Sequence, residues 1–339
     1  MNKLKALINH FKLATTMNTL FDEWLDSKRH LKAQSIRTYT QLLEGYLRPA
    51  FGEMAVREIR KETIQKFIDN MQKKYSAKTI HEVYRCLKTI FNLALRQGMI
   101  ENNPCEKIIL PPKEKTQAQS LSIKEQNKLE KALEPSENAL DIAILLALNL
   151  GLRLSEVVAL RWQDIRFKEN LVVIRHSMER IPTGEGRKTE ARLGKPKTQN
   201  ALRKIPLTAE FSAFLKHYYN SRNLKQKKNA AYVAGKKDGT AYHGRSIERH
   251  FKKRMKELGL SKDYTFHSLR HSFATRAMES GVAVKVISAL LGHSKTATTT
   301  EIYLHLSDHF IREEMMKMTK YQAKKRRRSK TKVPPVNAA

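Results

Sequence analysis

The sequence has few cysteines and no long apolar run, and these two absences exclude several classes of protein. Only Cys86 and Cys105 are present among 339 residues, too few for a disulfide framework or a four-cysteine zinc site. The best apolar stretch, residues 139–148, is shorter than the roughly 18 residues that a membrane span requires, and it contains Asp141. The first residues show no signal-peptide pattern. We therefore expect a soluble intracellular protein with no membrane partner.

Acidic residues are also scarce. The chain has 33 Asp and Glu against 65 Lys and Arg, a formal net charge of +32 at pH 7. Residues 171–270 alone carry 24 basic and 8 acidic residues, a net charge of +16, and residues 311–339 carry a further +8. A solvated surface would explain a small imbalance, but this excess lies in a region whose pattern is that of a folded domain. It predicts a polyanionic partner, most simply nucleic acid.

The first half has the apolar spacing of helices. In residues 76–98, apolar side chains recur every three or four residues and form one stripe, capped either by Ser76 or by a Thr79–Glu82 capping box. Three shorter helices are predicted at residues 19–28, 35–47 and 62–74, with Pro49 and Gly52 breaking the pattern between them. These segments predict a small helical bundle.

The second half is mixed. Strands are predicted at residues 171–175 and 203–207, separated by 27 residues that form a long hairpin with extended arms or a mobile loop. A further short strand is expected at 231–234. A capping box at Ser122 and Glu125 begins the second half, and the later helices are expected at 245–258, 267–280, 284–291 and 296–306.

Four short motifs in this half contain residue types that suit phosphate chemistry. They are Gly151-Leu-Arg-Leu-Ser-Glu156, Lys195-Pro-Lys-Thr198, His267-Ser-Leu-Arg270, and Leu291-Gly-His293 followed ten residues later by Tyr303. Each alone has an ordinary structural explanation, such as a surface ion pair on a helix. Their occurrence in this order over about 150 residues is far more specific. The set resembles the tyrosine recombinases, or phage-integrase family, and the similarity covers residues 15–318.

The resemblance implies a fold that is mostly α with a small antiparallel β-sheet in the second domain. Two domains, a helical core-binding domain and an α+β catalytic domain, would form a C-shaped clamp on DNA. The expected divisions are a short N-terminal segment 1–14, a core-binding domain 15–103, a linker 104–119, a catalytic domain 120–318 and a basic, disordered tail 319–339.

The resemblance also assigns the groups that act on the phosphate. Arg153 and Arg270 would hold its non-bridging oxygens, since a guanidinium offers a fork of donors and stays charged. Tyr303 would be the nucleophile of a covalent 3′-phosphotyrosyl link. Lys197 is expected to be the general acid for the leaving 5′-oxygen, and Lys195 is its rival for that role.

Three further residues would support this chemistry. His267 and His293 would complete the phosphate pocket, and Glu156 would orient a neighbouring side chain. No cofactor is implied, and the histidine pairs at positions 267/271 and 305/309 are not expected to bind metal.

The predicted function is a site-specific recombinase, the integrase of a mobile element, in the bacterial cytoplasm and associated with the nucleoid. Its partners would be double-stranded DNA at recombination sites, and three further copies in a tetramer joined through the helix beyond Tyr303. A host DNA-bending protein could assist. The alternatives are a chromosome-resolving recombinase, a topoisomerase IB-like strand relaxer, and a DNA-binding accessory protein that has lost catalysis.

Overall fold

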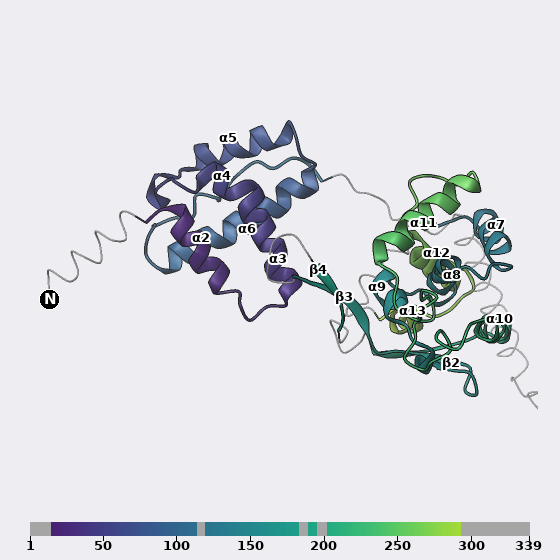
Figure 1. The fold of residues 1–339 in the computed structure, drawn as a ribbon. Coiled ribbons are helices and arrows are strands. Elements are labelled where there is room, and N and C mark those ends of the chain that lie inside the picture. The colour runs from purple at the N-terminus through teal and green to yellow at the C-terminus, as the bar shows by residue number, and fades with distance from the viewer. Residues whose placement is uncertain (1–14, 114–118, 183–188, 195–201, 293–339) are drawn as a thin grey trace, which may run out of the picture. The chain divides into compact units, whose positions relative to one another are not determined.

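The computed structural model describes residues 15–113, 119–182, 189–194 and 202–292. The chain divides into two compact units (Figure 1). The first comprises Met1–Thr116 with the short segment Arg180–Glu190, and the second comprises Gln117–Glu179 and Ala191–Ala339. The fold is mostly helical with small sheets, as the sequence predicted. The helix expected at 296–306 lies outside the described residues, and no helix within the described ranges is long and apolar enough to cross a membrane.

The first unit is a helical bundle, with α6 packed against α2, α3 and α5. The apolar stripe of α6 is buried in one core with side chains from the other helices, as its three- and four-residue spacing predicts. The elements are α2 (Met17–Asp26), α3 (Ala33–Leu42), η1 (Leu43–Leu47), α4 (Arg48–Phe51), η2 (Val56–Glu58), α5 (Lys61–Gln72) and α6 (Ala77–Arg96).

The start of α6 decides between the two predicted caps. The helix begins at Ala77, and the Ser76 hydroxyl accepts a hydrogen bond from the backbone N–H of Thr79 at 3.4 Å. Ser76 is therefore the N-cap, and the alternative box formed by Thr79 and Glu82 is wrong. The unpaired N–H groups of the first helical turn favour a hydroxyl one residue before the helix.

The expectation that Pro49 breaks the helical pattern is also wrong. Helical backbone continues from Ala33 through Phe51, and Pro49 lies in the first turn of α4. Proline has no N–H and its ring crowds the carbonyl four residues earlier, so a regular α-helix cannot pass through it. The preceding residues Leu43–Leu47 form a π-helical turn, whose wider ladder accommodates this crowding.

Residues that follow α6 are fastened to the first unit. The Tyr84 hydroxyl donates to the carbonyl of Cys105 at 2.6 Å, and Cys105 itself is fully buried. The Gln65 amide accepts from the N–H of Ile109 at 2.9 Å and donates to its carbonyl at 3.1 Å. The boundary between the two units, after Thr116, therefore follows a segment that belongs structurally to the first.

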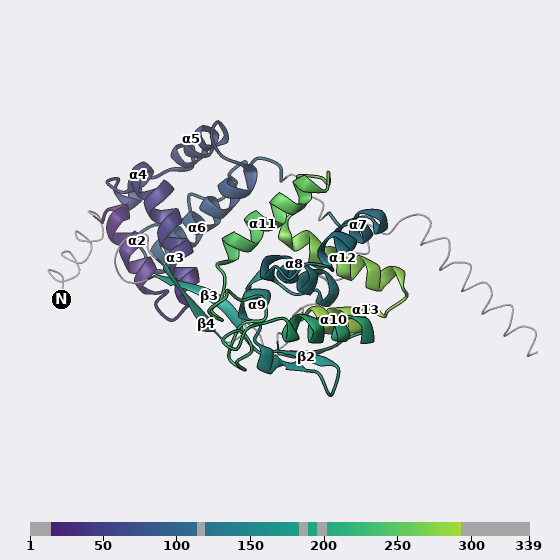
Figure 2. The ribbon, with the colours of Figure 1, turned by 45° about the vertical axis from the view of Figure 1, so that its right-hand side comes forward.

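In the second unit α8 is the central helix, and Figure 2 shows α7, α9, α11 and α12 around it. Its apolar residues are buried on all sides, consistent with its lack of a polar face. The helices are α7 (Ile123–Leu133), α8 (Ala139–Leu150), α9 (Leu154–Ala159), η3 (Trp162–Asp164), α10 (Ala209–Asn220), α11 (Gly244–Glu257), α12 (Phe266–Glu279) and α13 (Val284–Leu291).

Two small sheets belong to this half of the sequence. β1 (Ile165–Arg166), β2 (Leu171–Ile174) and β5 (Arg203–Pro206) form an antiparallel sheet in which Ile174 lies opposite Arg203. β3 (Ser177–Pro182) pairs with β4 (Thr189–Gly194), so the segment between β2 and β5 contains the extended hairpin arms that were one of the two predictions.

The strand expected at 231–234 is absent from the described residues, and this prediction is wrong. Tyr232 instead makes an isolated bridge to Arg161, and Val233 donates to the carbonyl of Leu160 at 2.9 Å. Beyond this bridge the chain turns at Gly235 and at Gly239, which has a φ of +83°. These turns end the pairing before a strand can form.

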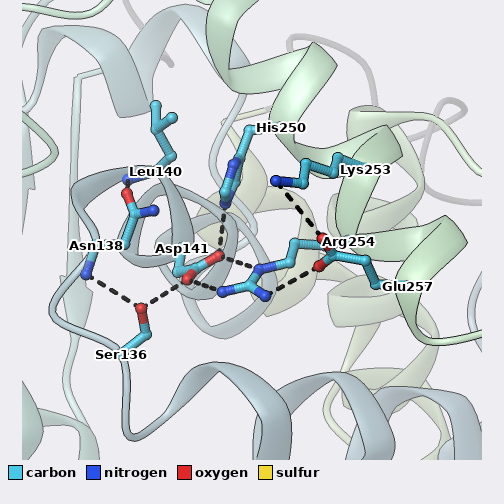
Figure 3. Close-up of polar contacts among 8 residues, drawn as sticks. All are labelled: Ser136, Asn138, Leu140, Asp141, His250, Lys253, Arg254 and Glu257. Carbon is cyan, nitrogen blue, oxygen red and sulfur yellow. Dashed lines mark hydrogen bonds and ion pairs between the residues drawn. The ribbon is translucent and has the colours of Figure 1, made fainter.

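One charged residue lies inside the apolar helix α8. Asp141 is fully buried, and its carboxylate accepts from Ser136, His250 and Arg254 (Figure 3). The Arg254 guanidinium is bidentate, with Nε at 2.8 Å from Oδ1 and Nη2 at 2.5 Å from Oδ2. Burial opposes ionisation of this carboxyl, but these hydrogen bonds lower the pKa of Asp141 below its ordinary value. The network fastens α11 to α8.

Candidate active site

Arg153 lies at the N-cap of α9, between α8 and the first turn of α9. Glu156, three residues later, accepts from the Arg153 backbone N–H at 2.9 Å and from its Nη1 at 2.8 Å. The carboxylate thus caps the helix and holds the guanidinium at the same time. The Arg153 side chain remains 35% exposed, so its remaining donors can reach a ligand.

The turn before Arg153 requires glycine. Gly151 has a φ of +61°, and a Cβ at this position would approach the Phe273 ring to 2.6 Å and the Leu291 side chain to 2.8 Å. The carbonyl of Gly151 accepts from Nη1 of Arg270 at 2.7 Å. The glycine of the motif therefore allows α8, α12 and α13 to approach closely and supplies an acceptor to the second arginine.

Arg270 lies on α12 and is 3% exposed. Its Nη2 donates to the carbonyl of Leu291 at 2.6 Å, and no carboxylate contacts it within the described part of the chain. Burial and the positive charges of Arg153 and Arg203 lower the pKa of Arg270 to about 9, which leaves the guanidinium charged at neutral pH. The charge of Glu156 opposes this shift, but a buried cation with no carboxylate in direct contact still favours binding of an anion.

A third arginine, Arg203, belongs to the site, although no sequence motif predicted it. Its Nη1 and Nη2 donate to the two oxygens of Glu156 at 3.0 and 2.8 Å, and its Nε donates to the carbonyl of Leu290 at 2.5 Å. The side chain is 5% exposed. Burial opposes ionisation of Glu156, but the hydrogen bonds and charges of Arg203 and Arg153 keep its pKa below the ordinary value.

The three arginines meet at the C-terminal end of α13. The carbonyls of Leu290, Leu291 and Gly292 accept from Arg203, Arg270 and Arg153 respectively, the last at 3.0 Å. These carbonyls lack partners within their own helix, and the C-terminal end of a helix carries partial negative charge. Three cations are therefore held together by backbone oxygens of consecutive residues, with one carboxylate among them.

His267 lies one turn before Arg270 on α12, and its ring lies edge-to-face against His271, with centroids 4.7 Å apart. Partial burial and the positive charges of Arg270 and Arg153 lower the pKa of His267. The residue keeps an exposed edge. A neutral imidazole can accept a proton, which is the property that a general base requires.

The structure thus brings together four of the seven residues singled out in the sequence, namely Arg153, Glu156, His267 and Arg270. Lys197 and its rival Lys195, as well as His293 and Tyr303, lie outside the described residues, although His293 directly follows Gly292. In the described ranges no three metal-binding side chains of His, Cys, Asp or Glu come together.

The comparisons with known proteins agree with this arrangement. Residues 119–309 match the model of the phage integrase family, and residues 17–109 match that of the phage integrase central domain. A tyrosine recombinase XerC-like protein of Caldanaerobacter subterraneus subsp. tengcongensis is 32% identical over 272 residues, covering 75% of this chain and 69% of that protein. Tyrosine recombinase XerD of Lacticaseibacillus casei is 28% identical over 310 residues, covering 86% and 94%.

Solved structures show the same fold. The Tn1549 transposon integrase in complex with a circular intermediate DNA has a TM-score of 0.77 at 22% identity, covering 89% of this chain and 99% of that one. The lambda integrase tetramer bound to a Holliday junction has a TM-score of 0.66 at 20% identity, covering 86% and 81%. The two family models and the XerC-like relative together show that the chain belongs to the phage integrase family and is a tyrosine recombinase.

Proposed function

We propose that this protein integrates and excises a mobile element by cutting and rejoining DNA through a covalent 3′-phosphotyrosyl intermediate at Tyr303. The observation that carries the proposal is the group of three guanidiniums at the end of α13, accompanied by the single carboxylate of Glu156. Three positive charges and one negative charge leave a net positive charge in the site. The Arg153 side chain is 35% exposed, so a ligand can reach this charge. A phosphodiester supplies the missing anion, and its charge increases at the non-bridging oxygens during the reaction.

In this mechanism the Tyr303 oxygen attacks the phosphorus in line, and the bond to the 5′-oxygen breaks. Arg153 and Arg270 hold the non-bridging oxygens, with His293 as an additional donor. His267 takes the proton of the Tyr303 hydroxyl, for which its lowered pKa suits it, and Lys197 gives a proton to the departing 5′-oxygen. The new phosphotyrosyl ester conserves the bond energy, so a 5′-hydroxyl from another strand rejoins the DNA by the reverse path.

Several further assignments belong to the same proposal. The unit within residues 15–113 would set the position on duplex DNA through phosphates and base edges. Four copies would assemble on the DNA through the helix beyond Tyr303, with a host DNA-bending protein as an additional partner, in the bacterial cytoplasm at the nucleoid. The fold is shared with a transposon integrase and with lambda integrase, whereas the more similar sequences are XerC-like and XerD tyrosine recombinases.

Covalent trapping tests the chemistry. A library of nicked duplexes with randomised sequence is incubated with the protein, and adducts are captured and sequenced to find the preferred site. The wild-type protein should form the adduct, and Tyr303→Phe should bind the same duplex without forming it. An adduct with the Phe variant would show that another residue is the nucleophile.

A second assay separates the alternatives. Two copies of the trapped site on one plasmid should recombine, whereas a strand relaxer would remove supercoils without exchange. The position of the trapped sequence in the genome then distinguishes the two biological roles. Sites at the ends of a mobile element support the proposal, and a single site in the replication terminus would support chromosome resolution instead.

A further inference from the structure

Arg203 connects three parts of the catalytic unit that are far apart in the sequence. It is the first residue of β5, six residues after Lys197, and its backbone lies opposite Ile174 in β2. Its side chain contacts Glu156, 47 positions earlier, and the carbonyl of Leu290, 87 positions later. A single guanidinium therefore links the strand β5, the helix α9 that follows Arg153, and the C-terminal end of α13.

The contacts of Glu156 show why this link matters for Arg153. Each carboxylate oxygen accepts one hydrogen bond from each arginine: Oε1 from Nη1 of Arg203 at 3.0 Å and from Nη1 of Arg153 at 2.8 Å. Oε2 accepts from Nη2 of Arg203 at 2.8 Å and from the Arg153 N–H at 2.9 Å. The planar fork of Arg203 fixes the rotamer of the carboxylate, and the carboxylate in turn fixes Arg153.

A direct role for Arg203 on the phosphate fits the geometry less well. All three of its nitrogens already donate to protein oxygens, two of them to the carboxylate of Glu156. Arg153, in contrast, is 35% exposed. Arg203 is thus placed behind the group that faces the ligand.

We propose that Arg203 is a positioning residue for DNA cleavage, which holds Arg153 in its working orientation through Glu156 and fixes the end of α13 through Leu290. The inference rests on the proposed function, because it assumes that Arg153 acts on the scissile phosphate. Its consequence is that loss of Arg203 slows the cleavage step while leaving DNA affinity nearly unchanged.

The first test compares Arg203→Met with Lys204→Met. Lys204 is the exposed neighbour on the same strand, so its replacement removes one positive charge without touching Glu156. Single-turnover trapping at saturating DNA, on the duplex selected by the wild-type protein, should be about 100-fold slower for Arg203→Met, as for a misplaced catalytic group. Lys204→Met should match the wild type. Arg203→Lys, which keeps the charge but lacks the fork, should fall between them.

A buried carboxylate without its partner could also weaken folding, and a double variant separates this effect from positioning. Arg203→Met combined with Glu156→Gln removes the carboxylate together with its buried partner, so the thermal midpoint should lie above that of Arg203→Met. Trapping should stay as slow as in Arg203→Met and be no slower than in Glu156→Gln alone, because both residues act on Arg153 through the same contact. Recovery of trapping together with the midpoint would overturn the proposal and show a role in stability alone.

The outcomes distinguish this inference from the proposed function. If the wild-type protein forms no adduct with any duplex, the proposed function fails. If it forms the adduct and Arg203→Met forms it equally fast, only the positioning role fails. A loss confined to DNA affinity in Arg203→Met, with the cleavage rate at saturation unchanged, would also contradict positioning and would assign Arg203 to DNA binding.

Discussion

Replacing Asp141 by asparagine should destabilise the second unit strongly, although the two side chains have nearly the same volume. Both carboxylate oxygens accept from Arg254, so in either orientation the new amide nitrogen would face a donor of that guanidinium (Figure 3). Breaking a buried ion pair on one side costs about 3–5 kcal/mol. The lower end applies here, because Arg254 is 29% exposed and water can reach it once it is unpaired.

A loss of about 3 kcal/mol corresponds to a fall of roughly 6–12 °C in the thermal midpoint of a unit of this size. The chain has two tryptophans, Trp24 in the first unit and Trp162 in the second, where it is 4% exposed. In a Trp24→Phe background, Trp162 fluorescence therefore reports unfolding of the second unit alone. The matched control is Glu137→Gln, which also replaces one carboxylate of an ion pair with arginine. Glu137 is 64% exposed, and its Oε2 lies 3.4 Å from Nη2 of Arg222, so this pair is at the surface. Such a surface pair contributes about 0.5 kcal/mol, or roughly 2 °C.

The pH dependence gives a second readout with a definite sign. The folded-state pKa of Asp141 lies below its unfolded value, so its stabilisation is fully present above the unfolded pKa and is lost as the pH falls through the folded one. The difference in midpoint between wild type and Asp141→Asn should be constant near neutrality and shrink below about pH 4. A midpoint within about 2 °C of the wild type at pH 7 would place Asp141→Asn with the surface control and show that the buried pair contributes little to stability.

Two further predictions concern the first unit. Burial raises the pKa of both thiols, Cys86 and Cys105, to about 12. The native protein at pH 8 should therefore resist a disulfide reagent that labels both thiols rapidly after unfolding. Rapid labelling of the native chain would contradict their burial. Ser76→Ala should lower the free energy of unfolding by about 1 kcal/mol in urea, because it removes the cap of α6. Ser35→Ala, at an exposed position inside α3, should leave it unchanged or raise it slightly, because alanine favours the helix interior, and equal losses would show that Ser76 is not acting as a cap.

The sequence predicts the helices well where the signal is local. The observed bounds of α13 are those predicted, and α11 and α12 differ by one residue at each end. These helices are read from apolar spacing and end signals that lie within the helix itself. Pro49 shows where such local rules are insufficient, because a π-helical turn before a proline preserves the helical path and has no sequence pattern of its own.

The site could be predicted only in part for a related reason. Arg153, Glu156, His267 and Arg270 belong to short motifs, but Arg203 contacts Glu156 across 47 residues and begins an ordinary strand. Its only sequence signal is a charged residue at the edge of an apolar strand pattern. The carbonyl acceptors at Leu290, Leu291 and Gly292 have no signal at all, since every residue carries one. Similarly, Asp141 was visible as an interruption of an apolar run, while its partners on α11 were not.

The way in which the arginines are held at the end of α13 has a consequence for the engineering of this enzyme. Their acceptors are main-chain oxygens, so a side-chain change at the partly exposed Leu290 would leave its acceptor in place. The insertion or deletion of one residue in α13 would be different, because it rotates the helix end by about 100° and shifts it by about 1.5 Å. The three carbonyls would then no longer face the arginines that they hold now. Variant libraries of this segment should therefore keep its length constant and leave the buried Ile287 and Leu291 unchanged.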